Sequence, residues 1–278
     1  MTKDKTISIL GLGWLGLPLA KSMLAKGYKV KGTVTHNEKA ALLADSGIDV
    51  SLLTLHHQHM VLTNVSFFDT DVLIINIPPR RTDDIETIYP AQIKQLLPSI
   101  TRHKIGKVIF VSSTSVYPAS EGTAIESETG LKPDKPSGVA CLNAENVLAN
   151  DNRFSTTVIR FGGLIGADRN PHRFMRSGVK NGDGNQPVNL IHLDDCIGII
   201  AHVIENEIWG EVINGCCPVH PIREEFYRKA AEVAGVEPPH FENNPGERHK
   251  TVSSEKIIEL GYQFKYQSPI DSLFSTNA

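Results

Sequence analysis

The sequence has no hydrophobic run long enough to cross a bilayer and no excess of positive charge. Its 278 residues carry 28 Lys and Arg against 31 Asp and Glu, a formal charge of −3. Nucleic-acid binding normally needs a strongly basic surface, so it is not expected here. No stretch approaches the roughly 20 apolar residues of a membrane span, and the N-terminus shows no small-residue cleavage pattern. We therefore expect a cytoplasmic protein that binds neither nucleic acid nor membranes.

Cysteine is also scarce, and no C-x-x-C pair indicates a structural zinc site. The four cysteines are Cys141, Cys196, Cys216 and Cys217. Neighbours in sequence form only a strained disulfide, so we expect four reduced thiols. His56, His57 and His59 cluster, but no nearby carboxylate or cysteine completes a ligand set. We therefore expect no metal.

Apolar residues make up 40% of the chain and charged residues 21%, which suits a packed core. Short β-rich runs alternate with segments of helical periodicity. The predicted strands are Thr6–Leu10, Tyr28–Val34, Val72–Ile77, Val108–Val111 and Thr157–Phe161, and the clearest predicted helices after the first βαβ unit are Asp84–Leu97 and Pro136–Ala149. This alternation is typical of an α/β protein, and it predicts a doubly wound parallel sheet, the Rossmann fold.

After Arg160 the sequence becomes rich in Gly, Pro and Asn up to position 187. A short strand at Val188–Ile191 and helices from Asp194, over Ile222–Ala234 and near Ser254–Leu260 are then predicted. We predict a dinucleotide-binding domain over residues 1–165 and a smaller substrate-binding lobe over 166–278. Because no flexible linker separates them, we expect one folding unit.

The segment Gly11-Leu12-Gly13-Trp14-Leu15-Gly16 is a G-x-G-x-x-G directly after an apolar strand and at the start of a helix. That context favours a dinucleotide site over an ordinary tight turn. Gly11 permits the turn, Gly13 lets the backbone approach a pyrophosphate, and Gly16 lets helix and sheet pack closely. The helix N–H groups face the negative charge. We assign this loop, including Trp14 and Leu15, to the cofactor.

The choice between NAD and NADP depends on the end of the second strand, where an acidic residue usually binds the ribose of NAD. Thr35 and His36 stand there, and the first acid, Glu38, comes late. His36 and Lys39 are able to contact a 2′-phosphate, so the sequence leans to NADP over NAD, with solvated helix-start residues as the alternative. Pro78, at the end of a predicted parallel strand, is expected to line the cofactor cleft or simply to end the strand.

Several later segments carry a more specific signal. In order along the chain they are Val108–Pro118 (VIFVSSTSVYP), Val158–Gly166 (VIRFGGLIG), Val188–Asp195 (VNLIHLDD) and Gly210–Asn214 (GEVIN). They resemble successive blocks of the extended short-chain dehydrogenase/reductases, also called NAD-dependent epimerase/dehydratases. Leu10 stands where that family usually has its first glycine, and the chain is similar to an atypical branch, the YeeZ-like group. The resemblance implies hydride transfer on a nucleotide sugar or another small carbonyl or alcohol.

The resemblance also exposes a departure at the expected active site. The family pattern Y-G-x-S-K-x-x-x-E aligns with residues 137–145, where Gly138 and Glu145 agree. Ser137 replaces the tyrosine acid/base, and Cys141 replaces the lysine that lowers the tyrosine pKa. A small buried thiol is the expected state of Cys141, with an activated nucleophile as the less favoured alternative.

Other residues are candidates for the remaining roles. The family serine or threonine falls on Ser113, Tyr117 is a possible replacement acid/base, and Ser112 is assigned to the cofactor. The candidate catalytic residues are thus Ser113, Ser137 and Tyr117. His172 and Arg173 are expected to bind an anionic group or to form a solvated basic loop. Asp194 and Asp195 are interpreted mainly as acids at a helix N-terminus, and Asn214-Gly215 as a strand-end turn near the substrate cleft.

Two hypotheses follow for the function. The first is an NAD(P)-dependent oxidoreductase or epimerase-like enzyme, in which another residue has taken over proton transfer. The second is a redox sensor or regulatory protein that keeps the dinucleotide pocket without turnover. Both imply a small-molecule ligand and a monomer or homodimer.

Overall fold

A computed structural model describes residues 4–80, 82–119, 121–166, 168–171, 182–242 and 249–275. Residues of the chain group into two compact units. Unit 1 comprises Met1–Val116, Lys132–Ile159 and Ile200–Val212, and unit 2 comprises Tyr117–Leu131, Arg160–Ile199 and Ile213–Ala278. The division into 1–165 and 166–278 stays a prediction. Among the described residues, none of the helices combines the length and apolar character needed to span a membrane.

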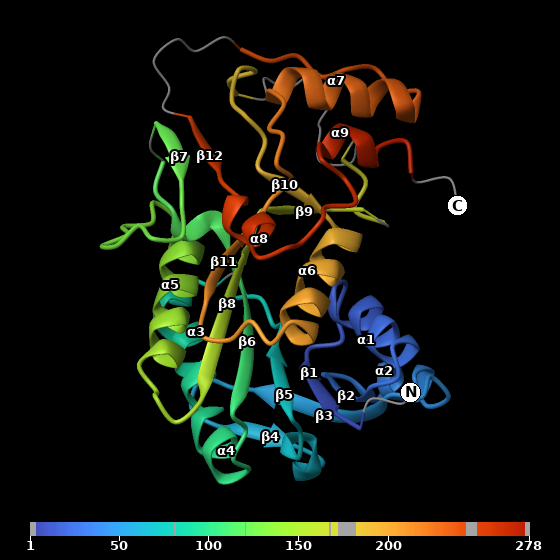
Figure 1. Ribbon diagram of the computed structural model, residues 1–278, viewed down its shortest axis with the longest axis vertical. Coiled ribbons are helices and arrows are strands. Elements are labelled where there is room, and N and C mark those ends of the chain that lie inside the picture. The colour runs from blue at the N-terminus through green and yellow to red at the C-terminus, as the bar shows by residue number, and fades with distance from the viewer. Residues whose placement is uncertain are drawn as a thin grey trace. The chain divides into compact units, whose positions relative to one another are not determined.

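An eight-stranded sheet dominates the fold (Figure 1). Its order is β11-β8-β6-β5-β1-β2-β3-β4. The strands are β1 (Thr6–Leu10), β2 (Lys29–Val34), β3 (Asp49–Leu55), β4 (Met60–Leu62), β5 (Val72–Ile75), β6 (Lys107–Ser113), β8 (Ser155–Phe161) and β11 (Val212–Gly215). β1 pairs in parallel with β2 and β5, and only β4 is shown to run antiparallel to its neighbour among the pairings described. The predicted α/β fold with a doubly wound sheet is therefore confirmed.

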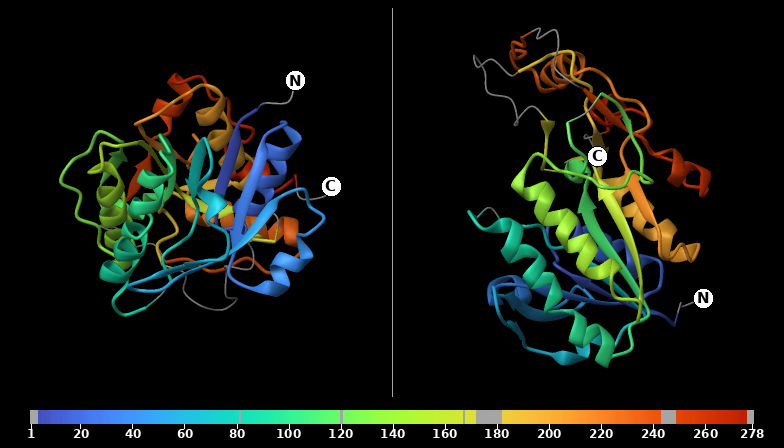
Figure 2. Two further views of the ribbon diagram at one scale, coloured as in Figure 1. Left: turned by 90° about the horizontal axis from the view of Figure 1, so that it is seen from below. Right: turned by 90° about the vertical axis from the view of Figure 1, so that its left-hand side faces the viewer.

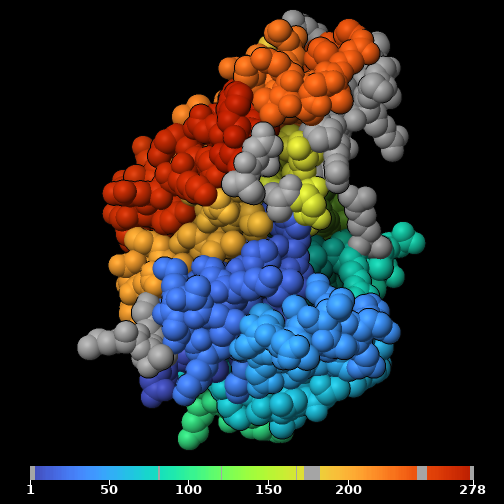
Figure 3. Space-filling view, turned by 90° about the vertical axis from the view of Figure 1, so that its right-hand side faces the viewer, coloured from blue at the N-terminus to red at the C-terminus, as the bar shows by residue number. Residues whose placement is uncertain are grey.

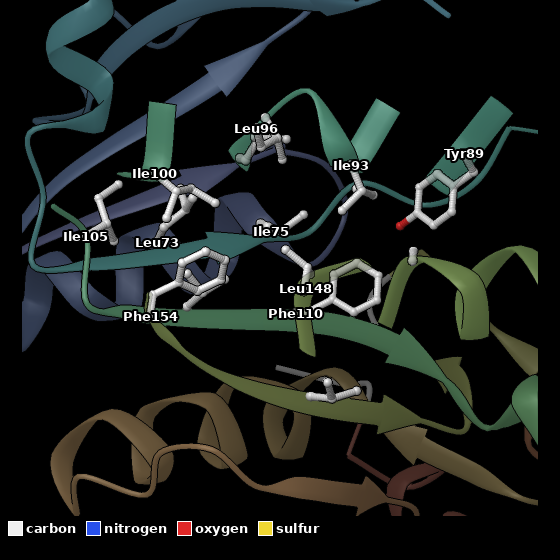
Figure 4. Close-up of a cluster of buried hydrophobic side chains, with 14 of the residues drawn as sticks. Leu73, Ile75, Tyr89, Ile93, Leu96, Ile100, Ile105, Phe110, Leu148 and Phe154 are labelled. Atoms are coloured by element: carbon white, nitrogen blue, oxygen red, sulfur yellow. The ribbon is translucent and has the colours of Figure 1, made fainter. Parts of the chain in front are cut away.

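Helices cover both faces of the sheet in unit 1. On one face lies α1 (Gly16–Ala25), which buries Leu19, Ala20 and Met23. The residues of α1 and α2 (Asn37–Leu42) belong to the continuous blue surface in Figure 3. On the other face, α3 (Ile85–Lys94) and α5 (Pro136–Ala149) lie side by side (Figure 2). A buried cluster fills the space between these helices and the strands, with residues such as Ile75, Ile93 and Leu148 (Figure 4). The helices thus bury the apolar faces that the sequence periodicity indicated.

The predicted helix over Asp84–Leu97 corresponds to α3, which ends at Lys94, and after a break a second helix that was not predicted, α4, spans Leu97–Arg102. Pro98 explains the break, since it has no N–H to donate to the carbonyl of Lys94 four residues earlier. Pro90 lies inside α3 and likewise leaves the Glu86 carbonyl without its helical donor. Asn143 Nδ2 of α5 donates to that carbonyl at 3.4 Å.

The hairpin of β3 and β4 was not predicted. The polar turn between them carries the histidine cluster, in which the rings of His56 and His59 stack with centroids 4.2 Å apart. Gln95 of the α3–α4 connection donates to the backbone carbonyls of His56 and His57 at 2.9 and 3.0 Å. No group of three or more His, Cys, Asp or Glu in the described part of the chain is arranged to hold a metal ion.

Unit 2 contains two small parallel strand pairs and several helices. The pairs are β9 (Gly163–Ile165) with β10 (Leu190–His192), and β7 (Gly122–Ala124) with β12 (Lys250–Val252). The helices are α6 (Leu193–Glu205), whose C-terminal half belongs to unit 1, α7 (Arg223–Ala234), α8 (Glu255–Glu259) and α9 (Pro269–Ser272). Asp194 and Asp195 lie in the first turn of α6, as predicted. The buried Asp195 carboxylate accepts hydrogen bonds from the Tyr262 hydroxyl and the Lys265 N–H, at 2.8 and 2.7 Å, and so ties the C-terminal segment to this helix.

Candidate functional site

The turn between β1 and α1 is held by two close backbone approaches that only glycine permits. Gly11 has φ of +103°, and a Cβ there would lie 2.7 Å from the Asn76 carbonyl oxygen. A Cβ on Gly16 would lie 2.0 Å from the carbonyl oxygen of Gly11. The Gly11 N–H donates to Thr33 Oγ1 at 3.0 Å, and Asn76 Nδ2 donates to the Gly11 carbonyl at 3.2 Å. The strands on either side of β1 therefore hold this turn in place.

Gly13 differs from the other two glycines, because a Cβ there would meet nothing within 4 Å. The residue is exposed, and it precedes a helix with no side-chain cap and no acidic residue in its first turn. The first N–H groups of a helix lack intrahelical partners and carry partial positive charge, so they attract anions. Open space before such a helix start is the arrangement that a pyrophosphate needs.

A pocket of about 310 Å³ lies over this turn. Its lining is Gly11, Leu12, Gly13, Thr33, Val34, Thr35, Lys39, Leu53, Leu55, Asn76, Ile77, Pro78, Arg80 and Gln92. The volume falls within the range of small-molecule sites. Together with the glycine cradle, the pocket fits a dinucleotide: residues 11–16 would hold the pyrophosphate, and the ends of β2 and β3 would surround the adenosine.

Five of the ten predicted cofactor residues line this pocket, namely Gly11, Gly13, Thr35, Lys39 and Pro78. The other five are Trp14, Leu15, Gly16, His36 and Ser112, and their contacts with a cofactor stay predictions. Leu15 and Gly16 are buried at the start of α1. His36 is exposed and precedes α2 without a side-chain cap bond. Ser112 is buried, and its hydroxyl donates to Glu145 Oε1 at 2.6 Å.

Sequence reasoning missed several lining residues, among them the polar Arg80 and Gln92. Gln92 Nε2 donates to the Leu55 carbonyl at 2.8 Å and so connects α3 to the end of β3. A signal for Arg80 was present, because it follows the Pro78-Pro79 pair already assigned to the cleft. Gln92 and Leu55 gave no such signal, since only the fold brings α3 and β3 together.

The expected acid/base segment lies on α5, whose observed bounds are those predicted. A Cβ on Gly138 would lie 2.2 Å from the Ser115 carbonyl oxygen, so glycine lets the helix pack closely against the turn Thr114–Val116. Ser137 is half-buried beside that contact. Ser113 is also half-buried, and its hydroxyl accepts the Ser115 N–H at 3.1 Å. Both hydroxyls therefore belong to the region where α5 meets the end of β6.

Cys141 lies on the inner side of α5 in a buried setting that suppresses ionisation. Burial, and to a smaller extent the negative charge of Glu145, raise the pKa of its thiol to about 12, against a smaller opposing effect of the Ser112 hydroxyl. No cation contributes to this shift. A reactive thiolate needs a nearby positive charge or a helix N-terminus. The environment matches the expected buried thiol and gives no support to a nucleophile.

Tyr117 lies in unit 2 within a buried polar cluster. Its hydroxyl donates to Asn214 Oδ1 at 2.8 Å and accepts from Arg160 Nη1 at 3.0 Å. Burial raises the pKa of the phenol, and the neighbouring Arg160 guanidinium and the Asn214 hydrogen bond oppose that rise. Lys250 Nζ donates to the Tyr117 backbone carbonyl. The hydrogen-bonding capacity of the phenol is thus largely engaged within this cluster.

The remaining candidates have varied settings. His172 and Arg173 lie outside the described residues. Asn214 is fully buried, and its backbone N–H donates to Glu126 Oε1 at 2.8 Å.

All four cysteines are free and buried. In unit 2, burial raises the pKa of the Cys217 thiol to about 12 and that of Cys216 further, so neither is primed for exchange.

Comparison with known proteins gives consistent results. Residues 7–214 match the model of the NAD dependent epimerase/dehydratase family. Protein YeeZ of Escherichia coli (strain K12) is 36% identical over 270 residues, which cover 96% of this chain and 98% of that protein.

Two solved structures show the same fold. A UDP-glucuronic acid 4-epimerase from Bacillus cereus in complex with NAD has a TM-score of 0.77 at 20% identity, covering 97% of this chain and 99% of that one. MoeE5 in complex with UDP-glucose and NAD has a TM-score of 0.80 at 17% identity, covering 99% and 97%. The resemblance of the sequence blocks is therefore confirmed, and the chain belongs to the NAD-dependent epimerase/dehydratase family.

Proposed function

We propose that the chain is an NADP-preferring member of this family that acts on a nucleotide sugar or another small carbonyl or alcohol. The observation that carries the proposal is the pocket over the β1–α1 turn, in which Gly13 faces open space before an uncapped helix start. Two structural relatives support the nucleotide-sugar class. MoeE5 was solved with UDP-glucose, and the Bacillus cereus protein is a UDP-glucuronic acid 4-epimerase.

The bound cofactor would supply a hydride acceptor or donor, and the chain would supply binding and orientation. Backbone N–H groups at the start of α1 would bind the pyrophosphate, which approaches over Gly13. Lys39, in the first half of α2, lines the pocket as a cation without a carboxylate beside it in the lining. That lining favours a 2′-phosphate over a free ribose hydroxyl, and His36 lies three residues before Lys39 in the chain. Pro78 would form a rigid wall of the cleft.

The catalytic assignments are Ser113, Ser137 and Tyr117. Ser113 and Ser137 are half-buried hydroxyls near the end of β6, and each is able to donate one hydrogen bond to a substrate oxygen. Neither is acidic enough to replace a phenol in full proton transfer. Tyr117 is the phenol among the three candidates, and its partner Arg160 offsets part of the rise in the phenol pKa that burial causes.

A second candidate function is a non-catalytic NAD(P)-binding redox sensor or regulatory protein. The specific observation in its favour is Cys141, where a buried neutral thiol stands in the position of the family lysine. Such a protein would keep the dinucleotide site and respond to the redox state of the bound cofactor. It would show no turnover with any small carbonyl or alcohol.

Fluorescence titration with NADPH and NADH tests the proposal. We expect saturable binding of both with tighter binding of NADPH, and a loss of about 100-fold or more in Gly13→Asp, because a carboxylate would stand where the pyrophosphate approaches. Gly13→Ala is the matched control, since a methyl group there contacts nothing within 4 Å of protein. Unchanged binding in Gly13→Asp, with an intact circular dichroism spectrum, would remove the pyrophosphate assignment.

Turnover separates the two candidates. A panel of nucleotide sugars and small carbonyls with NADPH is expected to include at least one substrate if the enzyme assignment is right. Binding of NADPH without turnover of any member of the panel would favour the sensor.

A cytoplasmic location and a monomeric or homodimeric state complete the proposal.

A further inference from the structure

Two cations from different elements face the same pocket. Lys39 comes from α2, immediately after β2, and Arg80 comes from the connection between β5 and α3. Both side chains are exposed. The pocket lining contains no Asp or Glu among the described residues. This side of unit 1 therefore presents two positive charges to one cavity.

Neither charge has an ionic partner among the residues that the structure describes. Within the described ranges, Lys39 and Arg80 form no ion pair or side-chain hydrogen bond. The acids nearest in sequence, Glu38 on α2 and Asp83 before α3, do not contribute to the pocket lining. Two like charges around one cavity repel each other and are stabilised by an anion between them. The cavity is thus prepared for a negatively charged group.

The pyrophosphate does not account for both cations, because the start of α1 already provides its N–H donors. In this fold the end of β2 lies beside the adenosine ribose, whose 2′-hydroxyl carries the extra phosphate of NADP. That phosphate brings about 1.5 to 2 further negative charges at neutral pH. We propose that Arg80 binds the 2′-phosphate of NADP opposite Lys39 and thereby sets the preference for NADP over NAD. This inference rests on the proposed function, since it presupposes the dinucleotide site.

The local sequence suits Arg80 to this role. The preceding residues, Pro78 and Pro79, have fixed φ angles and no N–H groups, so the turn that carries Arg80 is stiff. Pro78 itself lines the pocket. A guanidinium presents a planar set of donors that binds a phosphate through two parallel hydrogen bonds, which a lysine cannot match. Arg80 would therefore distinguish NADP from NAD by the geometry of its hydrogen bonds as well as by its charge.

The test is calorimetric titration of wild type, Arg80→Ala and Arg80→Lys with NADPH and NADH. A parallel titration uses adenosine 2′,5′-bisphosphate and AMP, which differ only in the 2′-phosphate and lack nicotinamide. We expect Arg80→Ala to weaken NADPH and the bisphosphate by about tenfold, the scale of one charge-assisted contact. NADH and AMP should change less than about twofold, and Arg80→Lys should lie between wild type and Arg80→Ala. Arg102→Ala, at the exposed end of α4 and outside the pocket lining, is the matched control and should change nothing.

Two outcomes would overturn the inference while leaving the dinucleotide site intact. Equal losses for NADPH and NADH would place Arg80 on a group that both cofactors share. Unchanged NADPH binding in Arg80→Ala would show that Arg80 makes no contact with the 2′-phosphate. If wild type bound neither cofactor, the proposed function itself would fail and the inference with it.

Discussion

The β1–α1 turn and helix α5 belong to the same unit, but they differ in how closely their functional residues match the family pattern. The turn keeps its glycines at the two positions where a Cβ would collide with backbone, Gly11 and Gly16. Helix α5 keeps its bounds and its close approach at Gly138, yet the residues expected to carry a proton are Ser137 and Cys141. One site is built from backbone and the other from side chains.

This difference shows how each kind of site is lost. A backbone site is protected by folding, because replacing its glycines disturbs the packing of helix and sheet. A side-chain site depends on two residues only, so Ser137 and Cys141 in place of a tyrosine and a lysine, as the family resemblance implies, would remove it from a helix that still forms. We therefore propose that this family member keeps cofactor binding without the family's acid/base pair.

The largest expected effect concerns the reactivity of Cys141. A pKa of about 12 against an ordinary 9 makes its thiolate about 1000-fold rarer at pH 8, and burial also excludes reagents. Alkylation by iodoacetamide, followed by peptide mass spectrometry, should be slower than at an exposed thiol by at least that factor. Its rate should rise about tenfold per pH unit up to the pKa. Asn146→Cys, exposed on the same helix, is the control. Equal rates at the two positions would restore Cys141 as a candidate nucleophile.

Next in size is the effect of glycine substitution on stability. Gly16→Ala should lower the free energy of unfolding by about 3 kcal/mol, because its methyl group would lie 2.0 Å from the Gly11 carbonyl oxygen. Gly13→Ala should change it by less than about 0.5 kcal/mol, because the added atom meets no neighbour. Urea denaturation measures both. Similar stability in the two variants would mean that the turn does not depend on close backbone packing.

A smaller effect is expected for Lys39→Ala. Loss of one exposed charge contact should weaken NADPH by about 1 kcal/mol and leave NADH nearly unchanged. Titrations at low and high salt should show that the difference shrinks as salt screens the contact. Lys21→Ala, on the exposed side of α1 and outside the pocket lining, controls for net charge. Tighter binding of NADH than NADPH by wild type would reverse the cofactor preference.

The smallest effect concerns Ser137. Ser137→Ala should change any measured turnover by less than about twofold, because a serine hydroxyl is a poor proton donor.

The double variant Ser137→Tyr with Cys141→Lys sharpens the comparison. It places a phenol and an ammonium at i and i+4 on one face of α5 and should introduce or raise reduction of simple carbonyls by NADPH. A large loss in Ser137→Ala would instead show that the serine carries the proton or anchors the substrate.

The sequence predicted the parts of the fold that repeat a strong local pattern. Strand Thr6–Leu10 and helix Pro136–Ala149 have the predicted bounds, because buried apolar residues and a proline at the helix start mark them clearly. The β3–β4 hairpin was missed because its turn is rich in histidine and lacks the Gly or Asn that usually marks a hairpin. Helix α4 was not predicted, and the break before it follows from Pro98, which lies one residue beyond the predicted helix Asp84–Leu97.

The residues of the candidate site likewise fall into those that the sequence predicted and those that it did not. Gly11, Gly13 and Lys39 were identified because a contiguous motif or its fixed spacing to the next strand marks them. Leu55 and Gln92 were missed because they reach the pocket from elements whose adjacency only the folded sheet establishes. The burial of Cys141 was expected from its place on the inner face of a helix, whereas the effect of Glu145 and the size of the pKa shift depend on the folded surroundings.

A crystal structure of the chain with NADPH is the most direct test of the central claim, that the backbone cradle persists without the family's acid/base pair. We predict the pyrophosphate on the N–H groups of residues 13–16, the 2′-phosphate between Lys39 and Arg80, and Ser137 and Cys141 facing the nicotinamide with no tyrosine or lysine in their places. A pyrophosphate bound away from the β1–α1 turn, or a crystal in which saturating NADPH leaves this pocket empty, would contradict the account.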